Sequence, residues 1–288
     1  MFMTRTEKIF EAAIVACLCL LSLIALVPLL SVLSLSFSSS RMVDLNEVTI
    51  WPREFNLDSW NYMLGRADLW KSALITLVST LIGTTSALLI TALLAYPLSK
   101  KEFKIGGILM VAVVVTMVFK APLIPYFLTV KGIGLYNNPL VLIIPHVLSP
   151  FNLIIMRTFF RQFPKELEEA AFMEGCGYFR LLFQFVLPLS KAVLATLALF
   201  YGVMIWNQFQ HPLLFIQNPD WFPLQIKIRQ FVTDPNEMLF TESIMNIKYN
   251  ERTLRAVTVV FAIIPVIIVY PFLQKYFVKG ALIGSVKG

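Results

Sequence analysis

Long apolar runs constrain this sequence more than any other feature. Two of them, residues 12–37 and 72–98, contain no charged side chain from one end to the other. A helix of about 20 apolar residues crosses the hydrocarbon core of a bilayer, and both runs exceed that length. Backbone inside lipid must satisfy its own hydrogen bonds, so runs of this length form helices. The chain is therefore predicted to be an integral membrane protein.

Six segments meet this requirement, and they predict an all-α protein with six transmembrane helices in a single domain, residues 1–288. The predicted spans are residues 12–37, 72–98, 105–130, 139–160, 192–216 and 255–277. The fourth contains Pro145 and Pro150, which are expected to kink or interrupt it. With 58% hydrophobic and 14% charged residues, the whole chain is more apolar than a soluble domain.

The net charge of +7 is better explained by basic residues that orient the chain in a membrane than by nucleic-acid binding. The basic residues stand in short clusters between apolar runs, which leaves no continuous basic face. The short loop 99–104, SKKEFK, holds three lysines and one glutamate. Short loops rich in lysine and arginine stay on the cytoplasmic side. Both termini and the charged segment near residue 170 are therefore expected in the cytoplasm.

That charged segment, residues 164–188, is predicted to form a helix, a sharp turn and a second helix. Pro164 suits the first turn of a helix, where its missing N–H costs nothing. Gly175 and Gly177 end the helix, and a second helix begins near Tyr178. The first helix has a small apolar face beside a glutamate-rich face. Anionic lipid repels glutamate, so docking into a protein groove is favoured over an interfacial helix that rests on lipid.

Within this segment the letters EEAAFMEGCGYFRLLFQFVLP, residues 168–188, resemble the "EAA" loop of permease subunits in bacterial ABC importers. The matching positions are Glu169, Ala170, Ala171, Gly175, the hydrophobic Phe185, Leu187 and Pro188. The resemblance implies that residues 158–191 form a cytoplasmic coupling loop that docks on an ATPase. The coupling residues it implies are Glu168, Glu169, Ala170, Ala171, Glu174 and Gly175.

The resemblance extends to the carbohydrate branch of the family, the maltose-permease-like type with six spans. Residues 121–145, rich in proline and followed by a glycine turn, look like the third span of that branch. Residues 274–288 are similar to its short cytoplasmic tail, which reaches the ATPases. Within the branch the chain looks closest to permeases of polysaccharide-fragment importers and to those named for lipoproteins.

The resemblance also implies partners and a location. The chain has no P-loop string G-x-x-x-x-G-K-[ST], so ATP and Mg²⁺ would be bound by two partner ATPase subunits, and the chain itself is not an enzyme. A sister permease would complete the pathway in the bacterial inner membrane, and no cofactor is expected in this chain. The outer segments 38–71 and 217–254 either anchor the bundle or receive an extracytoplasmic solute-binding protein.

Polar residues within the spans are candidates for lining the substrate pathway, because lipid does not tolerate them. The candidates are Lys120, His146, Asn152, Trp206, Asn207, Gln208, Gln210 and His211. Each of them could instead make a hydrogen bond between helices. Tyr201 and Phe209, with Trp206, could stack on a sugar ring. No carboxylate or thiolate accompanies the histidines in their spans, so a metal site is not expected.

Lys120 is a cation in mid-span, and three interpretations of it are open. It could bind an anionic substrate such as a uronate-containing oligosaccharide, extend toward the outer interface, or pair with the sister subunit. The predicted function is import of a carbohydrate, in particular an oligosaccharide. The alternatives are a secondary transporter, an importer of a non-sugar solute, and a membrane-embedded enzyme. A secondary transporter would predict inverted repeats and paired charges at the midplane.

Overall fold

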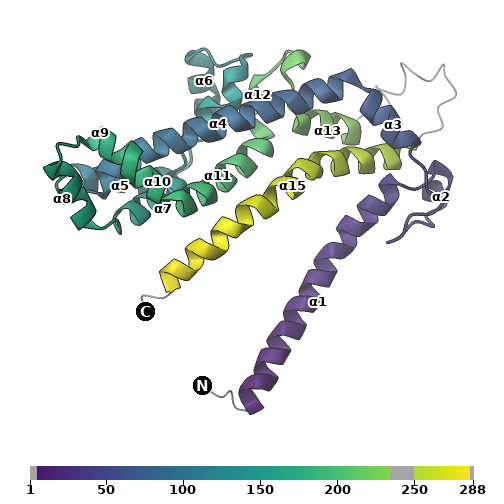
Figure 1. Ribbon diagram of the computed structural model, residues 1–288. Coiled ribbons are helices and arrows are strands. Elements are labelled where there is room, and N and C mark those ends of the chain that lie inside the picture. Colours follow the sequence, from purple (N-terminus) through teal and green to yellow (C-terminus); the bar gives the residue numbers. More distant parts are fainter. Residues whose placement is uncertain (1–4, 234–249, 286–288) are drawn as a thin grey trace. The chain divides into compact units, whose positions relative to one another are not determined.

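The computed structural model describes residues 5–233 and 250–285, and these residues are almost entirely helical (Figure 1). The described ranges contain no strand, apart from an isolated bridge between Ser38 and Phe55. Extended backbone is confined to short connections. The predicted all-α class is therefore confirmed.

Several of the predicted spans are divided into two pieces. In chain order the helices are α1 (Arg5–Ser36), α2 (Ser40–Asp44), α3 (Asp58–Gly65), α4 (Ala67–Ser99), α5 (Gly106–Val118), α6 (Leu123–Gly132), η1 (Pro139–Leu142), η2 (Ile144–His146), α7 (Pro150–Phe160), α8 (Lys165–Met173), α9 (Tyr178–Leu181), the π-helical turn η3 (Leu182–Val186), α10 (Leu187–Leu189), α11 (Lys191–Trp206), α12 (Gln210–Phe215), η4 (Pro219–Trp221), α13 (Leu224–Thr233) and α15 (Glu251–Ser285).

Within residues 5–233 and 250–285, four helices are long and apolar enough to cross a membrane: Ile9–Ser36, Ala67–Ser99, Lys191–Phe215 and Glu251–Pro271. Two further pairs, α5 with α6 and η1–η2 with α7, bend by 118° and 45° at short breaks. If each bent pair crosses once, six spans result, and the count of six stays a prediction. The predicted interruption of the fourth span by proline is confirmed. The third predicted span is also broken, between Val118 and Leu123, where Lys120 and Pro122 stand.

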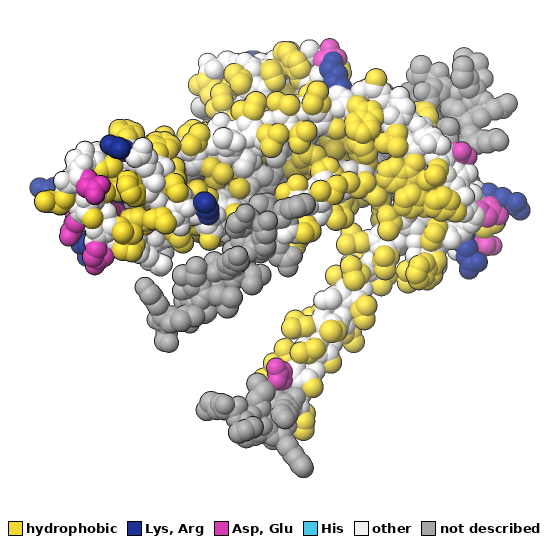
Figure 2. Space-filling view, viewed as in Figure 1, with side chains coloured by type: hydrophobic (Ala, Val, Ile, Leu, Met, Phe, Trp, Pro, Cys, Tyr) yellow, Lys and Arg dark blue, Asp and Glu magenta, His cyan; other side chains and the backbone are white. Residues whose placement is uncertain are grey.

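The described residues group into two compact units. The first contains residues 5–70, 227–233 and 250–264. In it, Ser59 and Thr253 join α3 to α15 through a hydroxyl–hydroxyl hydrogen bond of 2.9 Å, and Trp70 packs edge-on against Phe261. The apolar stretch of α1 is wholly exposed and appears as a yellow rod in Figure 2.

The second unit contains residues 71–226 and 265–285, and its apolar core lies among α4, α7, α11 and the segment from α8 to α10. Tyr201 is fully buried in this core, where its hydroxyl bonds to Thr91 and accepts the backbone N–H of Ser149. Those contacts make Tyr201 a structural residue, so its predicted stacking on a sugar ring is not supported by its environment. Three residues of the predicted tail, 286–288, and part of the outer segment, 234–249, lie outside the described residues.

Candidate coupling segment and polar cluster

The α8 helix has sequence signals at both ends. Pro164 is its N-cap, and Glu166 and Glu168 occupy the first turn, near the positive end of the helix dipole. Glu174 is the C-cap, and Gly175 follows with φ of +77°. The backbone N–H of Gly175 donates to Phe172, and the N–H of Cys176 donates to Ala171, at 2.9 and 3.0 Å. This pattern is a Schellman motif, so the predicted glycine turn is confirmed.

The two alanines of the segment face opposite ways. Ala171 is 6% exposed and belongs to the core of its unit, whereas Ala170 is exposed. The expectation that alanines form the exposed docking face therefore holds for Ala170 and is wrong for Ala171. The exposed surface of α8 instead combines Glu169 with two apolar side chains, Leu167 and Met173, which are 47% and 89% exposed. Figure 2 shows acidic and apolar atoms intermixed on the part of the second unit where Figure 1 labels α8.

Glu168 does not belong to that exposed surface. Its carboxylate forms an ion pair with Lys100, in the loop after α4, and the two side chains are only 14% and 17% exposed. The Lys100 ammonium lies 4.6 Å from the centre of the Tyr96 ring. Sequence reasoning did not identify Lys100 or Tyr96, and no local motif connects residues 68 positions apart.

A second helical stretch follows the turn, as predicted, from Tyr178 to Leu189. It widens into a π-helical turn immediately before Pro188. Proline has no N–H to donate to the carbonyl four residues earlier, so a regular α-helical ladder is interrupted there. Ser190 then donates its hydroxyl to the Val186 carbonyl at 2.6 Å and leads into α11.

Three of the predicted pathway residues meet at the breaks in the helices. The rings of His146 and His211 pack edge-on with centroids 4.6 Å apart. Tyr126, which the sequence analysis missed, bonds through its hydroxyl to Nε2 of His211 at 2.7 Å. Gln208 is buried and donates to the Leu142 carbonyl at 3.0 Å. Nε2 of His146 and Oε1 of Gln208 are buried without a hydrogen-bond partner among the described residues.

Tyr126, His146, Gln208 and His211 are called the polar cluster below, and the other candidates have different surroundings. Lys120 is exposed at the break between α5 and α6, and Gln210 is exposed at the start of α12. Asn207 donates to the Val203 carbonyl and accepts from Gln225. Asn152 and Trp206 are buried, at 3% and 7% exposure. The structure thus brings His146, Gln208 and His211 together, and the pathway role of all eight candidates stays a prediction.

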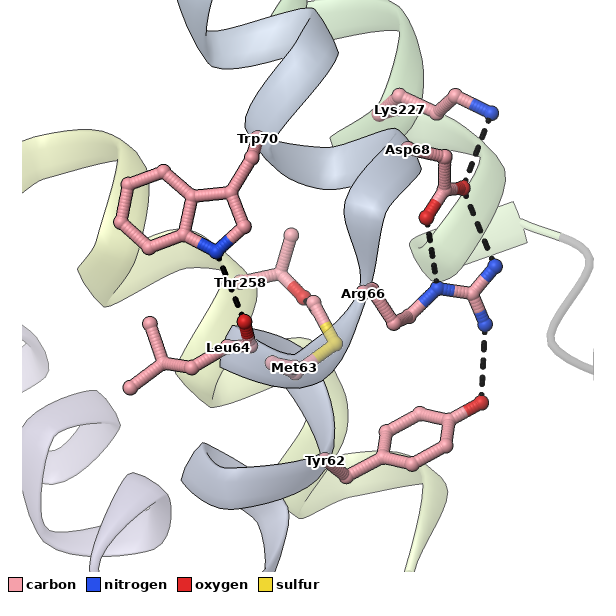
Figure 3. A network of polar contacts seen from close by, with 8 residues as sticks. All are labelled: Tyr62, Met63, Leu64, Arg66, Asp68, Trp70, Lys227 and Thr258. Atoms are coloured by element: carbon pink, nitrogen blue, oxygen red, sulfur yellow. Dashed lines mark hydrogen bonds and ion pairs between the residues drawn. The ribbon is translucent and has the colours of Figure 1, made fainter.

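A separate network fixes the first unit, in a region that the sequence analysis assigned to an outer loop (Figure 3). Arg66, after α3, donates from Nε and Nη2 to the two carboxylate oxygens of Asp68 at 3.0 and 3.1 Å. Lys227 of α13 lies 3.3 Å from the same carboxylate, and Tyr62 accepts from Nη1 of Arg66 at 2.9 Å. Burial lowers the pKa of Arg66, but the bonds and charge of Asp68 outweigh burial and raise it above its ordinary value. The network attaches α13 to the corner between α3 and α4.

Comparison with known proteins decides the family. Residues 70–282 match the family described as "Binding-protein-dependent transport system inner membrane component". The chain belongs to this family. The matched residues include the coupling segment, so the resemblance to ABC permease subunits is confirmed, and several apolar helices agree with an inner-membrane component.

Similar permeases cover nearly the whole chain. Protein LplC of Bacillus subtilis is 38% identical over 99% of this chain and 97% of its own length. The polygalacturonan/rhamnogalacturonan transport system permease protein YtcP of the same organism is 37% identical over 98% and 99%. One chain of the crystal structure of a bacterial ABC transporter involved in the import of the acidic polysaccharide alginate is 31% identical. It superposes with a TM-score of 0.88 over 96% of this permease and 99% of that chain.

Proposed function

We propose that this permease is the membrane subunit of an ATP-driven importer of oligosaccharides, and that its substrates carry carboxylates. The observation that carries the proposed coupling to an ATPase is the exposed surface of α8, where Glu169 shares a face with the exposed Met173, one helical turn further on. A mixed acidic and apolar helix face with a fixed Schellman turn is suited to a groove on a protein partner. The proposed partner is a pair of ATPase subunits that bind ATP and Mg²⁺, because this sequence has no P-loop.

The substrate class is supported by the names of the relatives. One similar permease is named for polygalacturonan and rhamnogalacturonan, and the similar solved transporter is involved in the import of alginate. These polysaccharides are polymers that contain uronic acids, so their fragments are anions. In this chain, Lys120 is an exposed cation at the break of a span, where it would meet a carboxylate. The polar cluster, with its unpaired His146 and Gln208 atoms, would hydrogen-bond to sugar hydroxyls.

The proposed mechanism is alternating access. ATP-driven closure of the ATPases displaces α8, and the displacement reaches α7 and α11 because the chain runs directly from α7 through α8 to α11. Both termini and the coupling loop are proposed to be cytoplasmic, on the basis of the lysines in loop 99–104. A sister permease is proposed to provide the second wall of the pathway.

On the outer side, the segments 38–71 and 217–254 are proposed to receive the solute-binding protein. The Arg66–Asp68–Lys227 network supports this role, because it holds α13 and therefore one end of the outer segment 217–254 in place. A docking surface with fixed ends loses less conformational entropy on binding than a free loop.

Copurification tests whether the permease binds an ATPase through α8. The permease is expressed with the proteins encoded beside it, and the ATPase retained on a tag on the permease is quantified. Glu169→Lys reverses an exposed charge and is expected to reduce the retained ATPase about tenfold or more. Glu47→Lys, a matched reversal at an exposed glutamate between α2 and α3, should leave it unchanged. The proposal fails if no ATPase copurifies with the wild type, or if Glu169→Lys retains it fully.

A further inference from the structure

The ion pair between Lys100 and Glu168 connects the C-terminal end of α4 to the first turn of α8, and it lies at the wall of a cavity. A cavity of about 640 Å³ lies between the end of α4 and the coupling segment, and Lys100, Glu168 and Tyr96 all line it. Displacement passes between helices most directly where side chains are close-packed. At the cavity wall such packing is reduced, so the polar contact adds a direct link between α4 and α8 beside the apolar core to which both contribute.

Position and burial both favour a strong contact here. Lys100 follows the C-terminal end of α4, and Glu168 lies in the first turn of α8. Each side chain therefore has the charge that is favourable at that end of its own helix dipole. Both side chains are mostly shielded from water, and the Tyr96 ring adds a cation–π contact with Lys100. An exposed ion pair contributes little to stability, but removal of one member of a shielded pair leaves the other charge without its partner.

A second contact holds the same end of α4. Nε of Arg157, in α7, donates to the Leu98 carbonyl at 2.8 Å. The end of α4 is therefore bonded to α7 through Arg157 and to α8 through Lys100. The α7 helix and α8 are also joined through the chain itself, so α8 can move relative to α7 only as far as the connection 161–164 allows. The link from α8 to α4 has no such covalent support nearby in sequence.

We propose that the Lys100–Glu168 ion pair carries the displacement of α8 to α4, which makes both residues positioning residues of the coupling step. Glu168 then does not contact the ATPase; Glu169, one residue on, does. The inference rests on the proposed function, since it concerns the path by which the ATPase moves the spans. It goes beyond that function in two respects. It adds α4 to the helices that move with α8, and it names the Lys100–Glu168 ion pair as the contact that moves α4.

The test follows ATP-dependent movement at the end of α4 in the intact complex. A cysteine replaces the exposed Lys101, in a chain where Cys17 and Cys19 are serine and Cys176 is alanine. The rate of maleimide labelling is compared without nucleotide and after trapping with ATP, Mg²⁺ and vanadate. The complex with Glu168 intact should change its labelling rate on trapping, and Glu168→Gln should reduce that change about fivefold or more. ATPase must still copurify with Glu168→Gln in wild-type amounts.

Four further variants distinguish a contact that transmits movement from one that only stabilises the structure. Lys100→Gln, and Lys100→Gln with Glu168→Gln, should each lose as much of the response as Glu168→Gln alone, because all three remove the same interaction. Lys100→Arg keeps the charge and the contact with the Tyr96 ring, and it should retain the response. Glu166→Gln, in the same helical turn, is the matched control and should leave the response intact.

An unchanged labelling response in Glu168→Gln, or an equal loss of response in Glu166→Gln, overturns this inference. Failure of the proposed function has a different signature, because ATPase would then be missing from the wild-type complex. If Glu168→Gln itself loses the ATPase, Glu168 is a docking contact and the assignment is wrong.

Discussion

At the scale of single residues, Gly175 is the position where the backbone most clearly dictates the amino acid. Its φ of +77° lies in the left-handed region, and a Cβ there would meet no atom within 4 Å. Any cost of substitution is therefore a backbone cost and not a steric clash with neighbours. Gly177, two residues later, has φ of −80° and equally open surroundings. The two glycines provide a matched pair.

Gly175→Ser is expected to lower the free energy of unfolding by about 1–2 kcal/mol, because an L-residue is strained in the left-handed region. Gly177→Ser should be neutral or stabilising, since serine is favoured at the N-cap of α9 and readily adopts the backbone angles that Gly177 has there. Denaturant titration of the purified permease in mixed micelles measures both. Equal destabilisation by the two substitutions would contradict this account of the turn.

At the scale of helices, α4 and α11 approach closely at a glycine. A Cβ at Gly83 would lie 2.8 Å from Cδ1 of Ile205, whereas a Cβ at Gly202 would lie 3.7 Å from Oγ1 of Thr84. The first distance requires a side chain to move, and the second is an ordinary contact. Small residues at such crossings let helices in a membrane pack by van der Waals contact.

Gly83→Ala is expected to destabilise the permease by about 1 kcal/mol, because overpacking against the fully buried Ile205 exceeds the gain in helix propensity from alanine. Ile205→Val removes the obstructing methyl group, so the double variant should recover most of that loss. Gly202→Ala is the control and should cost much less. A double-mutant cycle on the free energy of unfolding gives the coupling, and strictly additive effects would show that the Gly83–Ile205 contact is not the cause.

At the scale of the whole molecule, the sequence predicted those features that depend on neighbours along the chain. Apolar runs predicted the helices, and the spacing around Glu169 and Gly175 predicted the helix, the turn and the family. The contacts between Lys100 and Glu168, and between His146 and His211, could not be predicted, because each joins residues far apart in sequence. The inward orientation of Ala171 also depended on tertiary packing. In the third apolar run, Lys120 and Pro122 could have indicated that the helix is interrupted there.

ATP-driven uptake by the reconstituted importer tests the central claim most directly. Vesicles hold ATP and Mg²⁺ inside, with the solute-binding protein and either oligogalacturonate or a neutral malto-oligosaccharide of equal length outside. The account predicts ATP-dependent uptake that favours the acidic sugar, and a preference reduced about tenfold in Lys120→Met through loss of a charge-assisted contact. An unchanged preference in Lys120→Met would remove that residue from the pathway. Uptake that needs no ATP, or that favours the neutral sugar, would contradict the account as a whole.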